Sequence, residues 1–325
     1  MISIFEEILS RISYFKNRAY YNIDKKKYRE FYKAYRKMEN KEILEAIITQ
    51  EYHAIEKGLI KKNFRFGYGK RAITQLLFAL KKYTLLEFDK SNTRYLTGIS
   101  VLHEYILKHK DTDVDNTWIK NELDQMRTSS LNIGFGGIET VKRSDILDAS
   151  MKSFDILSKY RFSIRDYDDV KIDVEKIYKS LEIAQKTPSV CNRQGWKSRL
   201  ILDHESIKQI LELQGGFSGH GENIGALILI TSLDFYYNLP REKNQGFIDS
   251  GMYSMSLLYS LTNQGLASCP INANLTLKNE LEIRKKLNIK YNESLIMFIT
   301  VGNYQENIVI TKSKRDNYKE KLEIF

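Results

Sequence analysis

Two arginines and a serine alternate in the stretch RFSIR, at Arg161, Ser163 and Arg165. In an extended segment, alternate side chains share one face. Two guanidinium groups and a hydroxyl on one face suit an anion, because arginine offers paired donors to phosphate or carboxylate oxygens. The pattern alone is common, so a solvated surface is the competing interpretation unless other segments support a site.

The stretch TPSVCNRQGW, residues 187–196, is a second candidate. Asn192 and Gln194 alternate, so in extended backbone both amides would face one ligand edge. Each amide offers a donor and an acceptor, which suits the edge of a heterocycle. Trp196 leads into a predicted strand and is expected in the core. Cys191 lacks a neighbouring histidine, so we expect an unreactive, buried thiol.

The third segment, residues 249–273, begins as a long helix with small residues on one face. Gly251 and the serines that follow it would allow close helix packing. Gly265 ends this helix, since glycine readily takes the left-handed conformation found just beyond helix ends. Residues 266–273 are then expected to form a short irregular segment of backbone.

In order and spacing, these segments resemble the FMN-dependent nitroreductase family. The resemblance runs from about residue 155 to the end of the chain, and it includes Gly302-Asn303-Tyr304 followed by basic residues at 312–315. The sequence departs from the usual family pattern at Gly195, where the family has proline, at Asn303, and at Asn272-Ala273, where it has an acidic-Gly or Gly-Gly pair.

The resemblance implies an FMN site shared between the two protomers of a homodimer, and chemistry carried by flavin N5 rather than by an identifiable catalytic side chain. One protomer would bind FMN through Arg161, Phe162, Ser163 and Arg165, with Pro270, Ile271, Asn272 and Ala273 beside N5 and Arg315, or else Lys312 or Lys314, at the phosphate. The other protomer would supply Pro188, Ser189 and Asn192, and Gln194 is a further cofactor-binding candidate.

The motif His53-x-x-Glu56-Lys57-Gly58, followed by Arg65, is similar to the helical extension of nitroreductase-like proteins associated with polysaccharide biosynthesis. His53 and Glu56 share a helical face, but no third metal ligand accompanies them, so we expect a local pair rather than a metal site. Together with Lys57 and Arg65 they could cap the substrate pocket. His220 is a further candidate for that cap, with a solvent-exposed loop as the alternative.

The spacing of apolar residues and the glycines and prolines that end helices predict the elements that must position these residues. Helices are predicted within 1–37 and at 41–59, 71–88, 95–109, 116–126, 144–160, 173–184, 204–214, 247–265 and 277–289, and strands at 198–203, 225–233 and 293–304. We therefore expect an α+β, nitroreductase-like fold at 146–325, with a central, mostly antiparallel sheet flanked by helices, and an all-helical domain at 1–145.

The composition limits the classes of function. The chain has 325 residues, 42% of them hydrophobic, and only three prolines, which indicates a folded globular protein. Residues 1–110 hold 23 Lys/Arg against 12 Asp/Glu. These basic residues alternate with apolar ones at helical spacing and match no recognition motif, so we expect a solvated face and no nucleic acid partner. Two cysteines and no apolar run of about 20 residues favour a cytoplasmic protein without a membrane span.

The expected function is that of an FMN-dependent oxidoreductase that transfers hydride between NAD(P)H, the usual reductant, and a small-molecule acceptor. Two alternatives remain open. One is an enzyme with a non-standard use of the flavin site, such as oxidative tailoring, dehalogenation or flavin cleavage. The other is a divergent, FMN-free binding protein in cell-surface polysaccharide synthesis.

Overall fold

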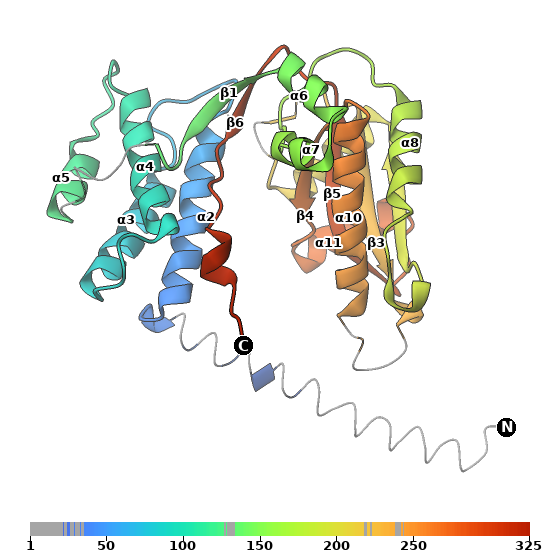
Figure 1. Ribbon diagram of the computed structural model, residues 1–325, viewed down its shortest axis with the longest axis horizontal. Helices are drawn as coiled ribbons and strands as arrows, with labels where there is room; N and C mark the ends of the chain where they lie inside the picture. Colours follow the sequence, from blue (N-terminus) through green and yellow to red (C-terminus); the bar gives the residue numbers. More distant parts are fainter. Residues whose placement is uncertain are drawn as a thin grey trace. The chain divides into compact units, whose positions relative to one another are not determined.

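The computed structural model describes residues 36–126, 128, 134–217, 220, 221, 223–237, 242 and 244–325, together with positions 22, 25, 26, 29 and 33. Two compact units make up the chain (Figure 1). One unit comprises the described part of 1–139 together with 311–325, and the other comprises 140–310. Most of the helix predicted within residues 1–37 lies outside the described residues. The domain boundary at 145–146 stays a prediction; it assigns 311–325 to the second domain.

Helices form the first unit, close to their predicted ranges: α2 (Lys41–Leu59), α3 (Lys70–Leu85), α4 (Thr93–Lys108) and α5 (Thr117–Gln125). Asn40 caps α2, because its side chain accepts a hydrogen bond from the backbone N–H of Ile43 at 3.0 Å. Asn92 caps α4 in the same way, accepting from the N–H of Arg94 at 2.9 Å. Two of these helices therefore begin at an asparagine whose side chain caps the first turn.

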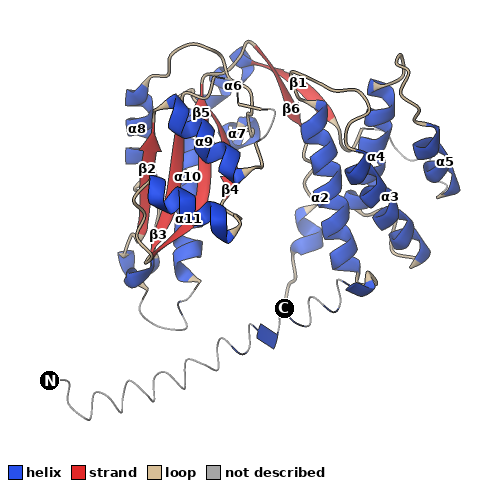
Figure 2. Cartoon of the chain, turned by 180° about the vertical axis from the view of Figure 1, so that it is seen from behind, coloured by secondary structure: helices blue, strands red, loops and turns tan. Residues whose placement is uncertain are grey.

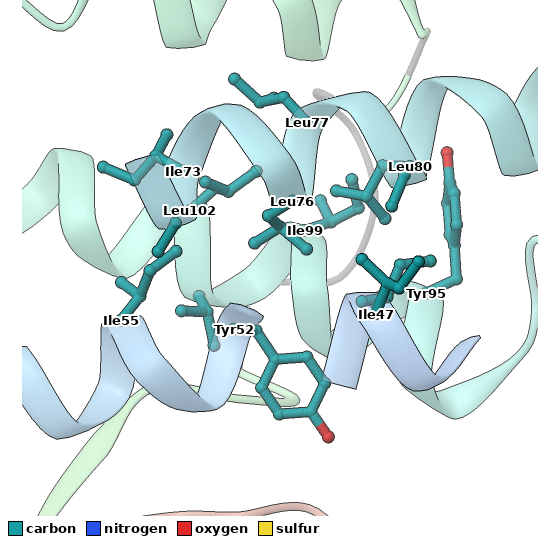
Figure 3. Close-up of a cluster of buried hydrophobic side chains, with 14 of the residues drawn as sticks. Ile47, Tyr52, Ile55, Ile73, Leu76, Leu77, Leu80, Tyr95, Ile99 and Leu102 are labelled. Carbon is teal, nitrogen blue, oxygen red and sulfur yellow. The ribbon is translucent and has the colours of Figure 1, made fainter. Parts of the chain in front are cut away.

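The core of the helical unit lies where α2, α3 and α4 meet (Figure 3). Ile55 from α2, Leu76 from α3 and Ile99 from α4 are at most 1% exposed. Burial of such a side chain stabilises the fold by about 2 kcal/mol. Gly98 keeps α4 close to its neighbours, since a Cβ there would lie 3.1 Å from the side chain of Ile48.

The C-terminal segment packs on this helical unit. Arg94 on α4 donates to Asp316 from Nε at 3.1 Å and from Nη2 at 2.8 Å, both to Oδ2. This hydrogen-bonded guanidinium lowers the pKa of the Asp316 carboxyl. A short 3₁₀ helix, Tyr318–Lys321, follows. The segment around Asp316 is therefore fixed to helix α4 of the helical unit.

Strands β1 (Ile138–Lys142) and β6 (Asn307–Thr311) pair as a two-stranded sheet where the chain passes between the units. Neither strand is among the strands that the sequence pattern predicted. Each strand has only five residues, and β1 has no fully buried position, so the apolar pattern is too weak to reveal it.

The second unit is built on a four-stranded antiparallel sheet, which confirms the predicted α+β class. Its strand order is β2 (Trp196–Ile201), β3 (Ala226–Leu233), β5 (Glu293–Gly302) and β4 (Ala267–Asn272). Helices α8 (Val174–Ala184) and α10 (Gln245–Asn263) cover one face, and α9 (His204–Gln214) and α11 (Leu277–Lys286) cover the other (Figure 2).

Each face of the sheet has its own hydrophobic core, and β3 contributes to both. Leu227 and Leu229 join the core beneath α9 and α11, whereas Ile228 and Ile230 join the core beneath α10. All four side chains are fully buried. This alternation explains the continuous apolar run, because a central strand buries both of its faces. The prediction of a buried central strand at 225–233 is confirmed.

Two expectations about local structure were wrong. Residues 266–273 are not irregular, since β4 occupies Ala267–Asn272 and pairs with β5. Proline is rare in strands because it lacks a backbone N–H, but the edge strand β4 tolerates Pro270. The helix predicted at 144–160 is broken at residues 151–153 into α6 (Arg143–Ser150) and α7 (Phe154–Tyr160). No helix among the described residues is long and apolar enough to cross a membrane.

Candidate functional site

The segment 161–165 runs beside edge strand β4. The backbone N–H of Ile164 donates to the carbonyl of Ser268 on β4 at 2.9 Å. Ile164 is buried in the core and Phe162 packs partly against it. The alternate residues Arg161, Ser163 and Arg165 are each partly exposed. The predicted alternation is therefore present, and the structure brings two of the sequence motifs together.

The arginines of this segment give the site its charge. Arg165 donates from Nη1 to the carbonyl of Ser163 at 3.2 Å, and it makes no ion pair with any residue that the structure describes. The charge of Arg161 acts on Tyr304, opposing the burial that raises the pKa of that hydroxyl. A partly exposed guanidinium without a carboxylate partner retains donors for an anionic ligand. This donor set fits the phosphate of a cofactor such as FMN.

The turn at 188–194 differs from the predicted extended stretch. Cys191, Asn192 and Gln194 have positive φ angles of 49°, 54° and 50°. Gln194 donates from Nε2 to Oδ1 and to the carbonyl of Asn192, both at 3.2 Å. The two amides therefore bind each other, and the argument that they share one extended face was wrong. The free acceptor and donor positions of this pair remain at the surface, since both residues are exposed.

Other residues of the turn divide between surface and core. Pro188 is exposed and Ser189 is partly buried, and the Oγ of Ser189 accepts a hydrogen bond from the N–H of Gln194 at 2.8 Å. Trp196 is buried and stacks on Tyr253 with ring centroids 4.8 Å apart, which confirms its predicted place in the core. Cys191 is exposed, so the expectation of a buried thiol was wrong at this position.

The segment predicted to lie beside flavin N5 is the end of β4. Ile271 is buried, whereas Pro270 and Ala273 are partly buried and Asn272 is exposed. Asn272 accepts a hydrogen bond at its backbone carbonyl from Nε2 of Gln214 at 3.1 Å. Its role at a flavin stays a prediction.

The cap candidates of the helical unit form the expected local pair. His53 Nδ1 lies 3.6 Å from Glu56 Oε2. The buried Glu56 also accepts from the N–H of Gly137 at 3.0 Å through Oε1, so it holds the start of β1 on α2. Lys57 is partly buried and Arg65 is exposed. No group of three or more His, Cys, Asp or Glu suited to a metal occurs among the described residues.

His220 lies in the other unit. Its side chain is only 3% exposed, so the alternative of a solvent-exposed loop was wrong. The Nδ1 atom of His220 lies 3.8 Å from Asp166 Oδ1, and His220 lines a cavity of about 670 Å³ whose apolar wall includes Phe217 and Ile224.

Arg315 is exposed in the C-terminal segment of the helical unit and donates to the Ser313 carbonyl. Its predicted contact with a phosphate stays a prediction.

Two residues that the sequence analysis missed fasten the 188–194 turn. Asp249 on α10 is fully buried and accepts from the N–H of Val190 at 3.3 Å and from the hydroxyl of Tyr237 at 3.1 Å. A signal for Asp249 was present, because it is the one charged residue within the helix α10. Tyr237 carried no comparable signal, since only the fold brings it to this turn.

One family model matches part of the chain. Residues 159–217 match the nitroreductase family, and these residues include both the arginine segment and the turn. No curated protein matches the chain.

Similar solved structures include a nitroreductase family protein from Clostridium difficile 630, with 22% identity over 53% of this chain and 98% of that one and a TM-score of 0.45. Others are an FMN-dependent nitroreductase from Clostridium difficile R20291 (23% identity, 52% and 96% coverage, TM-score 0.42) and a nitroreductase with bound FMN from Desulfitobacterium hafniense DCB-2 (17%, 51% and 94%, 0.39).

The match at residues 159–217 confirms the family resemblance inferred from the motifs for that part of the chain. The fold observed for residues 140–310, an antiparallel sheet between two layers of helices, agrees with it.

Proposed function

We propose that the chain is an FMN-dependent oxidoreductase that passes hydride from NAD(P)H to a small-molecule acceptor. The observation that carries this proposal is the partly exposed face of Arg161, Ser163 and Arg165 beside strand β4, within the residues that match the family. We also place the protein in the cytoplasm, and we connect its helical unit with polysaccharide biosynthesis through the His53–Arg65 motif.

The residues of the chain would hold and tune the cofactor. Bound FMN would supply two-electron chemistry at its N5 atom. Arg161 and Arg165 would bind the phosphate and the pyrimidine edge through charge-assisted hydrogen bonds, and their positive charge would stabilise negative charge on the ring. Asn192 would offer its side-chain amide from the partner protomer. Strand β4 would line the N5 edge with residues 270–273 and exclude water there.

The outward face of α10 supports the proposed homodimer. Phe247 and Ile248 are 53% and 52% exposed, and Met252 is 39% exposed. Nothing lies within 4 Å of the Cβ position of Gly251 on the same helix. Apolar side chains gathered around a glycine leave a flat surface onto which the backbone of another helix can pack closely. Size-exclusion chromatography with light scattering is expected to give a dimer; a monomer that retains flavin would contradict the shared site.

The decisive experiment is optical. Purified protein reconstituted with FMN and freed of excess cofactor is expected to be yellow, and its flavin absorption is expected to bleach when NADH or NADPH is added without oxygen. Protein that takes up no FMN would refute the proposal and favour an FMN-free binding protein. Yellow protein that neither nucleotide reduces would instead favour a non-standard flavin enzyme.

A further inference from the structure

A single buried carboxylate fastens the exposed turn to α10. Asp249 is fully buried, and three donors converge on it. The N–H of Val190 and the hydroxyl of Tyr237 reach Oδ2 at 3.3 and 3.1 Å, and Nε2 of Gln245 reaches Oδ1 at 2.8 Å. A carboxylate in such a place is stable only while its hydrogen bonds are made, so the turn and the helix are coupled through it.

Tyr237 also fills the space beside Gly195, which is the residue that departs from the family pattern. A Cβ at position 195 would lie 2.5 Å from the Tyr237 hydroxyl oxygen and 2.8 Å from its Cζ. The carbonyl of Gly195 accepts from the N–H of Leu233 at 2.7 Å, so the backbone cannot easily move away. Only glycine fits between this tyrosine and β3.

The guanidinium of Arg193 holds Tyr237 from its other side. It lies 5.1 Å from the centre of the Tyr237 ring, within the range of a cation–π interaction. The same group donates to both carboxylate oxygens of Glu242, at 2.6 and 3.1 Å, and to the carbonyl of Tyr236 at 2.8 Å. Tyr237 is thus fixed against both ends of the turn.

Backbone conformation explains why the turn needs these contacts. Cys191, Asn192 and Gln194 lie in the left-handed region, where a residue other than glycine costs roughly 1 kcal/mol. All three side chains are exposed, so their own packing cannot offset that cost. Hydrogen bonds from Gln194 to Ser189 and Asn192 offset part of this cost, and the fixed flanking positions, Val190 and Gly195, tie the turn to the rest of the fold.

We propose that Asp249 and Tyr237 are positioning residues that hold the 188–194 turn in its left-handed shape, and so present Ser189 and Asn192 to the cofactor. The proposal rests on the FMN function given above. It assigns to Gly195 the role of leaving room for Tyr237. Neither Asp249 nor Tyr237 needs to touch the cofactor.

The test separates the shape of the turn from cofactor binding. Tyr237→Phe removes only the hydroxyl that donates to Asp249, and Asp249→Ala removes the acceptor altogether. Tyr236→Phe is the matched control, because that neighbouring tyrosine is 48% exposed. Hydrogen exchange of the peptides covering 187–196 is measured in the FMN-free protein. The Kd for FMN is measured by quenching of flavin fluorescence, and the thermal midpoint is recorded for each variant.

Both Tyr237→Phe and Asp249→Ala are expected to accelerate exchange within 187–196. Tyr237→Phe loses one buried hydrogen bond and is expected to raise the Kd for FMN about tenfold, whereas Asp249→Ala loses three and is expected to raise it by at least about tenfold. Asp249→Asn, which keeps an acceptor oxygen, is expected to recover part of both effects, and Tyr236→Phe to change neither. Gly195→Ala is expected to weaken FMN binding in the natural chain but not in a Tyr237→Ala background, where the space is open.

The possible results are distinct. Unchanged exchange in Tyr237→Phe and Asp249→Ala would overturn the role of both residues in shaping the turn. Faster exchange with an unchanged Kd would overturn their role in cofactor binding. If the unmodified protein binds no FMN, the proposed function fails and the positioning role for FMN fails with it, while the exchange rates still show whether Asp249 and Tyr237 shape the turn.

Discussion

Replacing Arg94 with alanine is expected to release the C-terminal segment from the helical unit. Arg94 and Asp316 are 222 residues apart in sequence, and their side chains are 27% and 16% exposed. Two donors of one guanidinium meet Oδ2 of the carboxylate at 3.1 and 2.8 Å. This contact tests directly whether residues 311–325 belong with the helices rather than with the sheet.

The expected loss of unfolding free energy follows from this geometry. A fully exposed ion pair contributes up to about 1 kcal/mol, whereas breaking a buried one costs roughly 3–5 kcal/mol. The Arg94–Asp316 pair has two good hydrogen bonds and intermediate exposure, so Arg94→Ala is expected to cost about 2 kcal/mol at pH 7. Lys321→Ala is the control. Lys321 lies 3.5 Å from the same carboxylate but is 59% exposed, so its loss should cost less than about 0.5 kcal/mol.

The stabilisation that the Arg94–Asp316 pair gives to the fold should decrease as the pH falls. The hydrogen bond from Arg94 lowers the pKa of Asp316 from its ordinary value of 3.8. A carboxyl whose pKa is lower in the folded state stabilises the fold above the unfolded value, and this contribution disappears as the pH falls through the folded value. The coupling between Arg94→Ala and Asp316→Asn in a double-mutant cycle should therefore be constant above about pH 5 and decline below 3.8.

Tryptophan fluorescence can report on the helical unit alone. Trp118 lies in α5 and Trp196 in β2, so a Trp196→Phe background leaves one tryptophan, in the helical unit. Urea unfolding followed through Trp118 then gives the free energy for each variant. Two results would refute the reasoning: a change below 0.5 kcal/mol for Arg94→Ala, or a coupling that does not decline in acid.

Two further outcomes are expected. The double change Arg161→Ala with Arg165→Ala should abolish retention of FMN through gel filtration, because it removes both charged donors of the 161–165 segment; unchanged flavin content would refute that site. Gly302→Ala should lower the unfolding free energy by about 2 kcal/mol in a urea titration, because a Cβ there would lie 2.5 Å from the ring of the buried Tyr167. A stability within about 0.5 kcal/mol of the natural chain would show that Tyr167 can move aside.

Short-range patterns in the sequence predicted much of the fold. The cap at Asp173 and the break at Gly215 predicted the bounds of α8 and α9, and both were confirmed. The alternating stretch RFSIR predicted one shared face for Arg161, Ser163 and Arg165, and these three residues are partly exposed while Ile164 between them is buried. These features depend on residues within one or two turns of each other, so they can be inferred without knowledge of the fold.

Features that depend on distant contacts were missed or wrong. Residues 266–273 were expected to be irregular, and only the pairing of β4 with β5 at the sheet edge shows a strand there that accepts Pro270. The exposure of Cys191 and the mutual binding of Asn192 and Gln194 depend on a turn that neither residue specifies alone.

The sequence by itself therefore determined the class of fold, the start of α8, the end of α9 and the alternation of the arginine face, since each follows from the preferences of neighbouring residues. The tertiary structure alone decided the shape of the 188–194 turn and the place of the C-terminal segment. The turn requires Asp249, about 60 positions away, to offset its left-handed backbone, and the segment requires Arg94 as a partner for Asp316. Contacts over such separations leave no periodic trace in a sequence, because the residues that make them become neighbours only when the chain folds.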